Sequence, residues 1–144
     1  MAGRTISGTP DLHLLVDGKR LEASFRRGAT YTFSLPPRHA DVRIVSRASV
    51  PAELGFARDA RLLGVALHRI ELRQGHRLAV ADATDQRLVQ GFHTFESDIS
   101  ARWTNGDATL PAELFEAFEG TLRVVLYLGG NTQYLLLRDM ETAA

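Results

Sequence analysis

The chain has 144 residues, of which 44% are hydrophobic and 24% charged, a composition typical of one globular domain. Its 17 basic and 17 acidic residues give a formal net charge of zero. This balance excludes the overall positive charge that drives binding to nucleic acids, so we expect no nucleic-acid partner. The chain has no cysteine, which excludes disulfides, thiolate metal sites and thiol nucleophiles.

No stretch reaches the roughly 18 consecutive apolar residues that a membrane-spanning helix needs, so we expect no membrane span. Residues 1–11 hold one arginine and no apolar run, which does not fit a cleaved secretion signal. A cytoplasmic location is therefore the default expectation, with export without a cleaved signal as the open alternative. No linker or low-complexity tract divides the chain, which predicts a flexible segment at 1–11, one domain at 12–139 and a tail at 140–144.

Alternating apolar and polar side chains predict the first four strands. Residues 12–16 and 21–25 are expected to form a hairpin through the tight Asp-Gly turn at 17–18. Residues 29–35 show the same period of two, and residues 42–45 form the fourth expected strand. A long loop is expected to follow at 49–60, because proline and glycine interrupt it.

The next predicted strand, 63–73, has its apolar residues first at odd and then at even positions. Such a change of parity predicts either a β-bulge near His68-Arg69 or a strand whose first half is buried on both faces. A glycine turn leads into a further strand around 78–80. The Asn-Gly dipeptide at 105–106 predicts a hairpin that joins 103–104 to 107–110.

The C-terminal part adds one helix and two strands to the prediction. Residues 111–120 begin with proline and end with glycine, and predict a helix of about two turns that covers one end of the fold. Residues 122–128 alternate again, a turn is expected at 129–131, and 134–137 form the last strand. About nine short strands with one short helix predict an all-β fold, a single antiparallel β-sandwich resembling a jelly roll.

The motifs that usually carry catalysis are missing. The five histidines form no H-x-H or H-E-x-x-H pair, so no metal site is predicted. A nucleophile elbow and a phosphate-binding glycine loop are also absent, and no cofactor is expected. His93 and Glu96, three residues apart, are the best local candidates for acid–base chemistry. The competing interpretation is a structural hydrogen bond within a turn.

The most distinctive stretch is 91–110, which contains the sole tryptophan. Binding faces for sugars combine aromatic rings, which stack on the C–H groups of pyranoses, with planar hydrogen-bond partners for hydroxyls. Packing of the tryptophan in the core is the alternative. The candidate ligand-binding residues are Trp103, His93, Glu96, Asp107 and Arg102.

Charged residues flank the long loop. Arg47 and Arg61 are placed to pair with Glu53 or Asp59 and so tether the loop. An exposed pair of this kind contributes about 0–1 kcal/mol to stability. Such a network needs no ligand, so we expect its role to be structural.

Six short phrases occur in order along the chain: VDG at 16–18, the stretch 31–36, VRIVSR at 42–47 running into VPAEL at 50–54, DARLLGVA at 59–66, GFH at 91–93 with Glu96, and RWT at 102–104 with Asp107-Ala108. Together they resemble the β-rich C-terminal region of bacterial Hint-domain (Hedgehog/intein-type) proteins. The last two are also similar to a module appended to some bacterial glycosyltransferases. The resemblance covers residues 12–137.

The resemblance implies an accessory role. Hint domains process themselves with a cysteine or serine nucleophile and a histidine, and the matching phrases begin beyond that part, so self-processing is not carried over. The region is similar to modules found beside glycan-modifying enzymes, which makes recognition of a saccharide or of the cell envelope the expected role.

Three functions stay open at this point. The first is a non-catalytic accessory β-sandwich module that recognises a glycan or a protein. The second is a small jelly-roll-like enzyme in which His93 works with Glu96 or Asp107 as acid and base, converging at the bottom of a cavity. The third is self-assembly into a homo-oligomer through a sheet edge or an apolar face. The many leucines of 122–137 favour this possibility.

Overall fold

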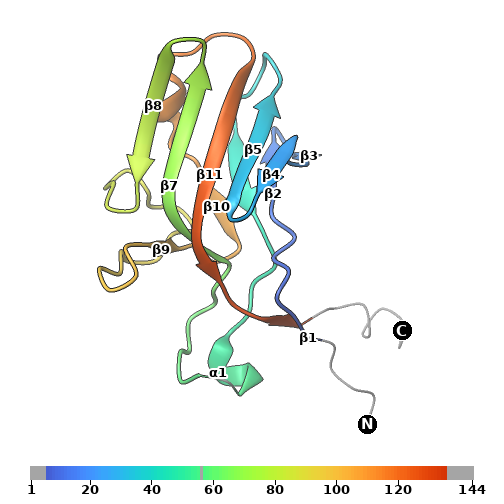
Figure 1. Cartoon of the computed structure of the whole chain (residues 1–144), viewed down its shortest axis with the longest axis vertical. Helices are drawn as coiled ribbons and strands as arrows, with labels where there is room; N and C mark the ends of the chain where they lie inside the picture. The colour runs from blue at the N-terminus through green and yellow to red at the C-terminus, as the bar shows by residue number, and fades with distance from the viewer. Residues whose placement is uncertain (1–5, 56, 136–144) are drawn as a thin grey trace.

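Two antiparallel sheets face each other across an apolar core in the computed structural model, which describes residues 6–55 and 57–135 (Figure 1). The four-stranded sheet has the order β10 (Asp107–Thr109), β6 (Val42–Val45), β2 (His13–Val16) and β3 (Lys19–Leu21). The six-stranded sheet has the order β4 (Phe25–Arg27), β5 (Thr30–Leu35), β11 (Leu122–Asn131), β7 (Val65–Gln74) and β8 (Arg77–Asp82), with β9 (Arg102–Trp103) paired to the start of β7. The predicted all-β sandwich is confirmed.

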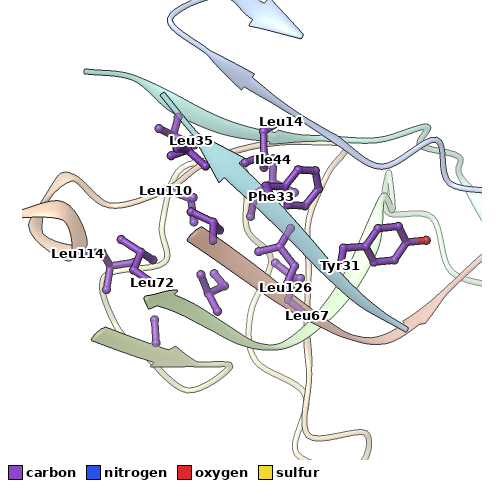
Figure 2. Packing of buried hydrophobic residues seen from close by; sticks show 14 of the residues in the cluster. Leu14, Tyr31, Phe33, Leu35, Ile44, Leu67, Leu72, Leu110, Leu114 and Leu126 are labelled. Atoms are coloured by element: carbon purple, nitrogen blue, oxygen red, sulfur yellow. The ribbon is translucent and has the colours of Figure 1, made fainter. Parts of the chain in front are cut away.

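The core lies between the two sheets and is built from the inward side of the alternating strands. Leu14 and Ile44 from the four-stranded sheet meet Phe33, Leu72 and Leu126 from the six-stranded sheet (Figure 2). All five side chains are fully buried. Each buried aliphatic or aromatic side chain of this size contributes about 1.5–3 kcal/mol relative to an exposed one, so this layer is the main source of stability.

The hairpin predicted at the Asp-Gly turn is confirmed, because β2 pairs with β3 from Leu14↔Leu21 to Val16↔Lys19. The predicted strand at 21–25 is interrupted, however. The chain leaves the four-stranded sheet after Leu21 and enters β4 of the six-stranded sheet at Phe25. Alternation continues across this crossing, so the sequence pattern does not reveal the change of sheet.

The β-bulge predicted near His68-Arg69 is also confirmed. Arg69 lies opposite Tyr127, but the next pair is Leu67↔Leu128, so His68 is the extra residue on β7. A second shift follows on β11, where Gly129 is skipped. The histidine ring donates from Nδ1 to the carbonyl of Ser100 at 2.6 Å and lies close to Gly129.

The hairpin predicted at Asn105-Gly106 does not form. The strands on either side, β9 and β10, belong to different sheets, since β9 pairs with β7 and β10 with β6. The dipeptide forms only a bend: the amide of Asp107 donates to the side-chain oxygen of Asn105, and Gly106 has φ +101°. The prediction of a tight reversal at Asn-Gly was therefore wrong, because the chain continues in one direction along residues 93–90 while it passes from one sheet to the other.

The predicted helix at 111–120 is reduced to the 3₁₀ helix η1 (Ala112–Phe115), and a single α-helical turn, α1 (Pro51–Leu54), lies in the loop expected at 49–60. The N-terminus of η1 has no capping side chain, and so short a helix gains too little to offset the cost of nucleation. The segment still covers an end of the core as expected, with Leu114 and Phe118 buried (Figure 2 shows Leu114).

The two ends of the described chain pair with each other. Strand β1 (Ile6–Ser7) lies in the segment expected to be flexible, and it pairs with β12 (Tyr134–Leu135). Residues 129–131, predicted as a turn, remain within β11. The predicted strand residues 136–137 and the tail at 140–144 lie outside the described residues. No helix in the described part of the chain is long and apolar enough to cross a membrane.

Candidate functional site

Four of the five predicted ligand-binding residues lie in one structural unit. The loop around residues 90–96 runs beside β9, with bridges at Phe92↔Thr104 and Glu96↔Ala101. The amide of His93 donates to the carbonyl of Trp103 at 2.8 Å, which fixes the loop against the strand. Asp107 lies on the other sheet, so the structure does not place it within this unit.

The polar members of the predicted set are held by the scaffold. The ring Nε2 of His93 hydrogen-bonds the carbonyl of Leu62 at 2.7 Å, and Asp107 pairs with Arg43 at 2.7 Å. His93 hydrogen-bonds neither Glu96 nor Asp107 through its ring, so the acid–base pair of the enzyme alternative does not form. The Arg102 guanidinium donates to three main-chain carbonyls, those of Ala83, Leu88 and His93.

Arg61 tethers the long loop as predicted. Its guanidinium pairs with Asp59 at 2.6 Å and with Glu96 at 3.0 Å, so it joins the loop to the segment before β9. Arg47 instead donates to the carbonyl of Thr9 at 2.8 Å. The hydrogen bond from Arg61 lowers the pKa of Asp59 to about 2. Glu96, a predicted ligand contact, thus has a structural partner.

Acidification is expected to weaken this tether. A carboxyl whose pKa is lower in the folded than in the unfolded state stabilises the fold above its unfolded pKa, here 3.8, and that contribution is lost as pH falls toward 2. We expect the unfolding free energy of Asp59→Asn to fall less than that of the wild type between pH 5 and pH 2. Urea denaturation at a series of pH values measures this difference.

Arg61→Gln provides the control, because it removes the group that lowers the pKa of Asp59. The two single variants and the double variant should share one reduced pH dependence. If Asp59→Asn keeps the wild-type pH dependence, the ion pair does not contribute to acid sensitivity.

Trp103 lies on β9 of the six-stranded sheet, opposite Ala66 at the start of β7. Directly opposite residues of antiparallel strands point to the same face. Val65 and Leu67 point into the core, so Ala66 and Trp103 point to the outer face, away from the four-stranded sheet. The indole is half-buried there, and it is not one of the residues that form the hydrophobic core cluster.

The outer face of the six-stranded sheet carries a buried carboxylate that sequence reasoning missed. Ile70 and Leu72 point into the core, so Glu71 between them points outward, yet only 3% of its side chain is exposed. An ionisable group buried on the solvent side of a sheet is uncommon unless its charge is compensated. Its partners therefore define a candidate site.

Three neighbours compensate Glu71. Arg73 donates through Nε at 2.8 Å, the Tyr127 hydroxyl donates at 3.0 Å, and Arg69 pairs with the other carboxylate oxygen at 2.5 Å. Burial raises the pKa of Glu71, but the hydrogen bonds from Arg73 and Tyr127 and the charges of both arginines outweigh it and lower the net pKa. Glu71 is thus ionised at neutral pH and holds two arginines and a tyrosine in fixed positions.

The strand register extends this network across the sheet. Tyr127 lies between Arg69 and Thr30, Val125 between Glu71 and Thr32, and Arg123 between Arg73 and Ser34. The arginine–glutamate network is thus bordered by a row of hydroxyl groups on β5. Beyond the bulge, the outer-face residues read from the register are Leu78, Val80 and Asp82 on β8, Arg69, Glu71 and Arg73 on β7, Arg123, Val125 and Tyr127 on β11, Thr30, Thr32 and Ser34 on β5, and Phe25 and Arg27 on β4.

None of four surface hollows formed by the described residues is lined by Trp103, His93 or Glu96. The largest, about 670 Å³, adjoins the outer face and is lined by Arg73 and Arg123. Within residues 6–55 and 57–135 no group of three or more potential metal-ligating side chains is found. No protein-family model, curated protein or solved structure matches the chain.

Proposed function

We propose that this protein is a non-catalytic recognition module that binds a saccharide on the outer face of its six-stranded sheet. The observation that carries the proposal is the fixed network of Arg69, Glu71, Arg73 and Tyr127. Strands β8, β7, β11 and β5 lie side by side as one layer beneath this network (Figure 1). The surface is open and broad rather than a closed pocket.

The chemistry of the face suits a sugar. Hydroxyl groups are recognised best by planar groups that offer donors in fixed directions, and a guanidinium offers five N–H donors. Both arginines keep about half of their side chains exposed, at 47% for Arg69 and 53% for Arg73, while Glu71 restricts their motion. Preorganised donors lose less conformational entropy when a ligand binds, which favours affinity.

Aromatic rings are available on the same face. The Arg69 guanidinium lies 5.9 Å from the centre of the Tyr127 ring, and Trp103 points to this face beyond the bulge. The Tyr127 ring already carries the Arg69 guanidinium, so Trp103 provides the stacking surface that the C–H side of a pyranose needs. The proposal therefore keeps Trp103 as a ligand contact and adds the network. It also agrees with the accessory role implied by the resemblance to Hint-associated and glycosyltransferase-appended regions.

Self-assembly is the second candidate, and a different observation favours it. Phe25 on one edge strand of the six-stranded sheet is 61% exposed, and Leu78 and Val80 on the opposite edge strand are 55% and 37% exposed. Exposed apolar side chains on edge strands favour pairing with a second chain. In this alternative, light scattering coupled to gel filtration shows a dimer that Leu78→Lys converts to a monomer.

A glycan array tests the saccharide proposal with three variants. We expect Arg73→Gln and Trp103→Ala each to lose about tenfold in affinity, equal to about 1.4 kcal/mol. Arg20→Gln is the matched control, because Arg20 has a similar exposure, 45%, pairs with Asp11 and lies on β3 of the other sheet. Each variant is first shown to be folded by circular dichroism.

The array separates the alternatives. If only Trp103→Ala loses affinity for the glycan, the binding site lies at β9 and its loop and not on the arginine–glutamate network. Equal loss with Arg20→Gln would mean that binding is not specific to the outer face. No binding of any glycan, together with a concentration-dependent dimer, would support self-assembly instead.

A further inference from the structure

The hollow of about 670 Å³ lies at one end of the outer face, beside the turn between β7 and β8 and the start of β11. Its residues come from three strands of the six-stranded sheet and the turns beside them. None of them is acidic, and two are arginines. The lining is Ser34, Leu35, Arg73, Gln74, Gly75, Thr121, Leu122 and Arg123.

The two arginines are direct neighbours. Arg73 on β7 lies opposite Arg123 on β11, and Ser34 lies opposite Arg123 on the other side. Like charges placed directly opposite each other on neighbouring strands destabilise a sheet. Among the described residues Arg123 forms no ion pair, so its charge is not compensated there.

Arg73 keeps a free donor for a ligand. Its Nε and Nη2 are used on Glu71 and Tyr127, while Nη1 bonds to no atom of the described residues. The Glu71 network therefore holds the guanidinium in place without occupying all its donors. One fixed arginine and one uncompensated arginine thus share the hollow.

The wall opposite β7 is held rigid by an amide. The Gln74 side chain donates to the carbonyls of Glu119 and Thr121, at 2.5 and 2.6 Å. These bonds fix the turn before β11 against the end of β7. The hollow is therefore formed by hydrogen-bonded backbone and does not depend on a loose loop.

We infer that this hollow binds an oxyanion, the carboxylate or sulfate group of an acidic saccharide. The inference rests on the proposed function and assigns its ligand class. Arg123 can bind such a group through two parallel hydrogen bonds and Arg73 through its free Nη1, and an anion between them removes their mutual repulsion. Ser34 lies in the same row of the sheet, with its hydroxyl hydrogen-bonded to Ser24 at 3.2 Å.

The test uses inorganic sulfate as the probe and ¹⁵N–¹H NMR as the measurement, with sodium chloride at equal ionic strength as the reference. We expect saturable shifts of the backbone amides of Gly75 and Thr121. Arg123→Gln should weaken binding at least tenfold. Arg27→Gln is the matched control, because Arg27 lies on β4 of the same face but does not line the hollow. Equal effects of the two substitutions, or no saturable shift, would overturn the inference.

A second arm distinguishes failure of the subsite from failure of the proposed function. Hyaluronan hexasaccharide, which carries carboxylates, is compared with chitin hexasaccharide, which is neutral, and with chondroitin sulfate of the same length. Preference for the acidic sugars that is lost in Arg123→Gln supports the inference, and the sulfated sugar shows which oxyanion is preferred. Equal binding of the neutral sugar refutes the acidic class but keeps the proposed function. Sulfate binding without any sugar binding refutes the saccharide function but keeps the subsite.

Discussion

Gly91→Ala is expected to destabilise the fold severely. A side-chain carbon at this position would lie 2.2 Å from the carbonyl oxygen of Asp107 and 2.5 Å from the Cα of Ala108, both in the backbone of β10. Gly91 also has φ +84°, where any other residue is strained. Because backbone atoms cannot rotate away, β10 would have to move out of its sheet. The loss should exceed about 4 kcal/mol, comparable to the whole stability of a small domain.

Gly18→Ala is the matched control for this experiment. Gly18 has nearly the same backbone angle, φ +81°, but nothing lies within 4 Å of an added carbon. Only the strain of the left-handed conformation is added, which costs about 1–2 kcal/mol. Urea denaturation followed by the fluorescence of the sole tryptophan gives both values. Equal urea midpoints for the two variants would show that β10 shifts to accommodate the extra carbon without loss of stability.

The second large effect is expected at the centre of the core. Phe33→Ala removes a fully buried ring from β5, and truncations of this kind cost about 3–5 kcal/mol because the cavity does not close. The adjacent Thr32→Ala is the control, since Thr32 points to the outer face and its loss should change the free energy by less than about 0.5 kcal/mol.

Thermal unfolding monitored by circular dichroism checks this pair of variants. Phe33→Ala should unfold at a much lower temperature than the wild type, with Thr32→Ala close to the wild type. Equal shifts for the two would mean that the two faces of β5 contribute alike, which would contradict the sandwich arrangement.

Much of the fold could be predicted from the sequence, because turns, strand periodicity and bulges depend on residues that are close together in the chain. The change of parity near His68 predicted the bulge, and the Asp-Gly turn predicted the β2–β3 hairpin. Which strands pair is a property of the whole chain. The crossing between Leu21 and Phe25, and the one at Asn105-Gly106, preserve alternation and turn chemistry, so neither pattern shows that the chain changes sheet.

The candidate site was only partly predictable. Charged residues at 69, 71 and 73 alternate with apolar ones, which is a sequence signal for an outward row on a strand. The burial of Glu71 also requires Tyr127, a residue 56 positions away that is brought close only by the pairing of β7 with β11. The predicted contacts His93, Arg102 and Asp107 proved to have main-chain or ion-pair partners, which depend on contacts between segments and leave no local pattern.

The two irregularities between β7 and β11 have a consequence for how the chain tolerates changes in length. His68 is surplus on one strand and Gly129 on the other, so the offset that the first introduces is cancelled by the second. A one-residue slip exchanges the two faces of a strand. His68 is the residue at which the alternation of β7 changes parity, so deleting it alone would leave Val65, Leu67, Ile70 and Leu72 on the inner face. Deleting Gly129 alone would likewise bring Leu128↔Leu67 and Gly130↔Ala66 into direct succession. Each strand can thus lose its surplus residue without exchanging its two faces, whereas a deletion elsewhere in β7 or β11 would exchange them.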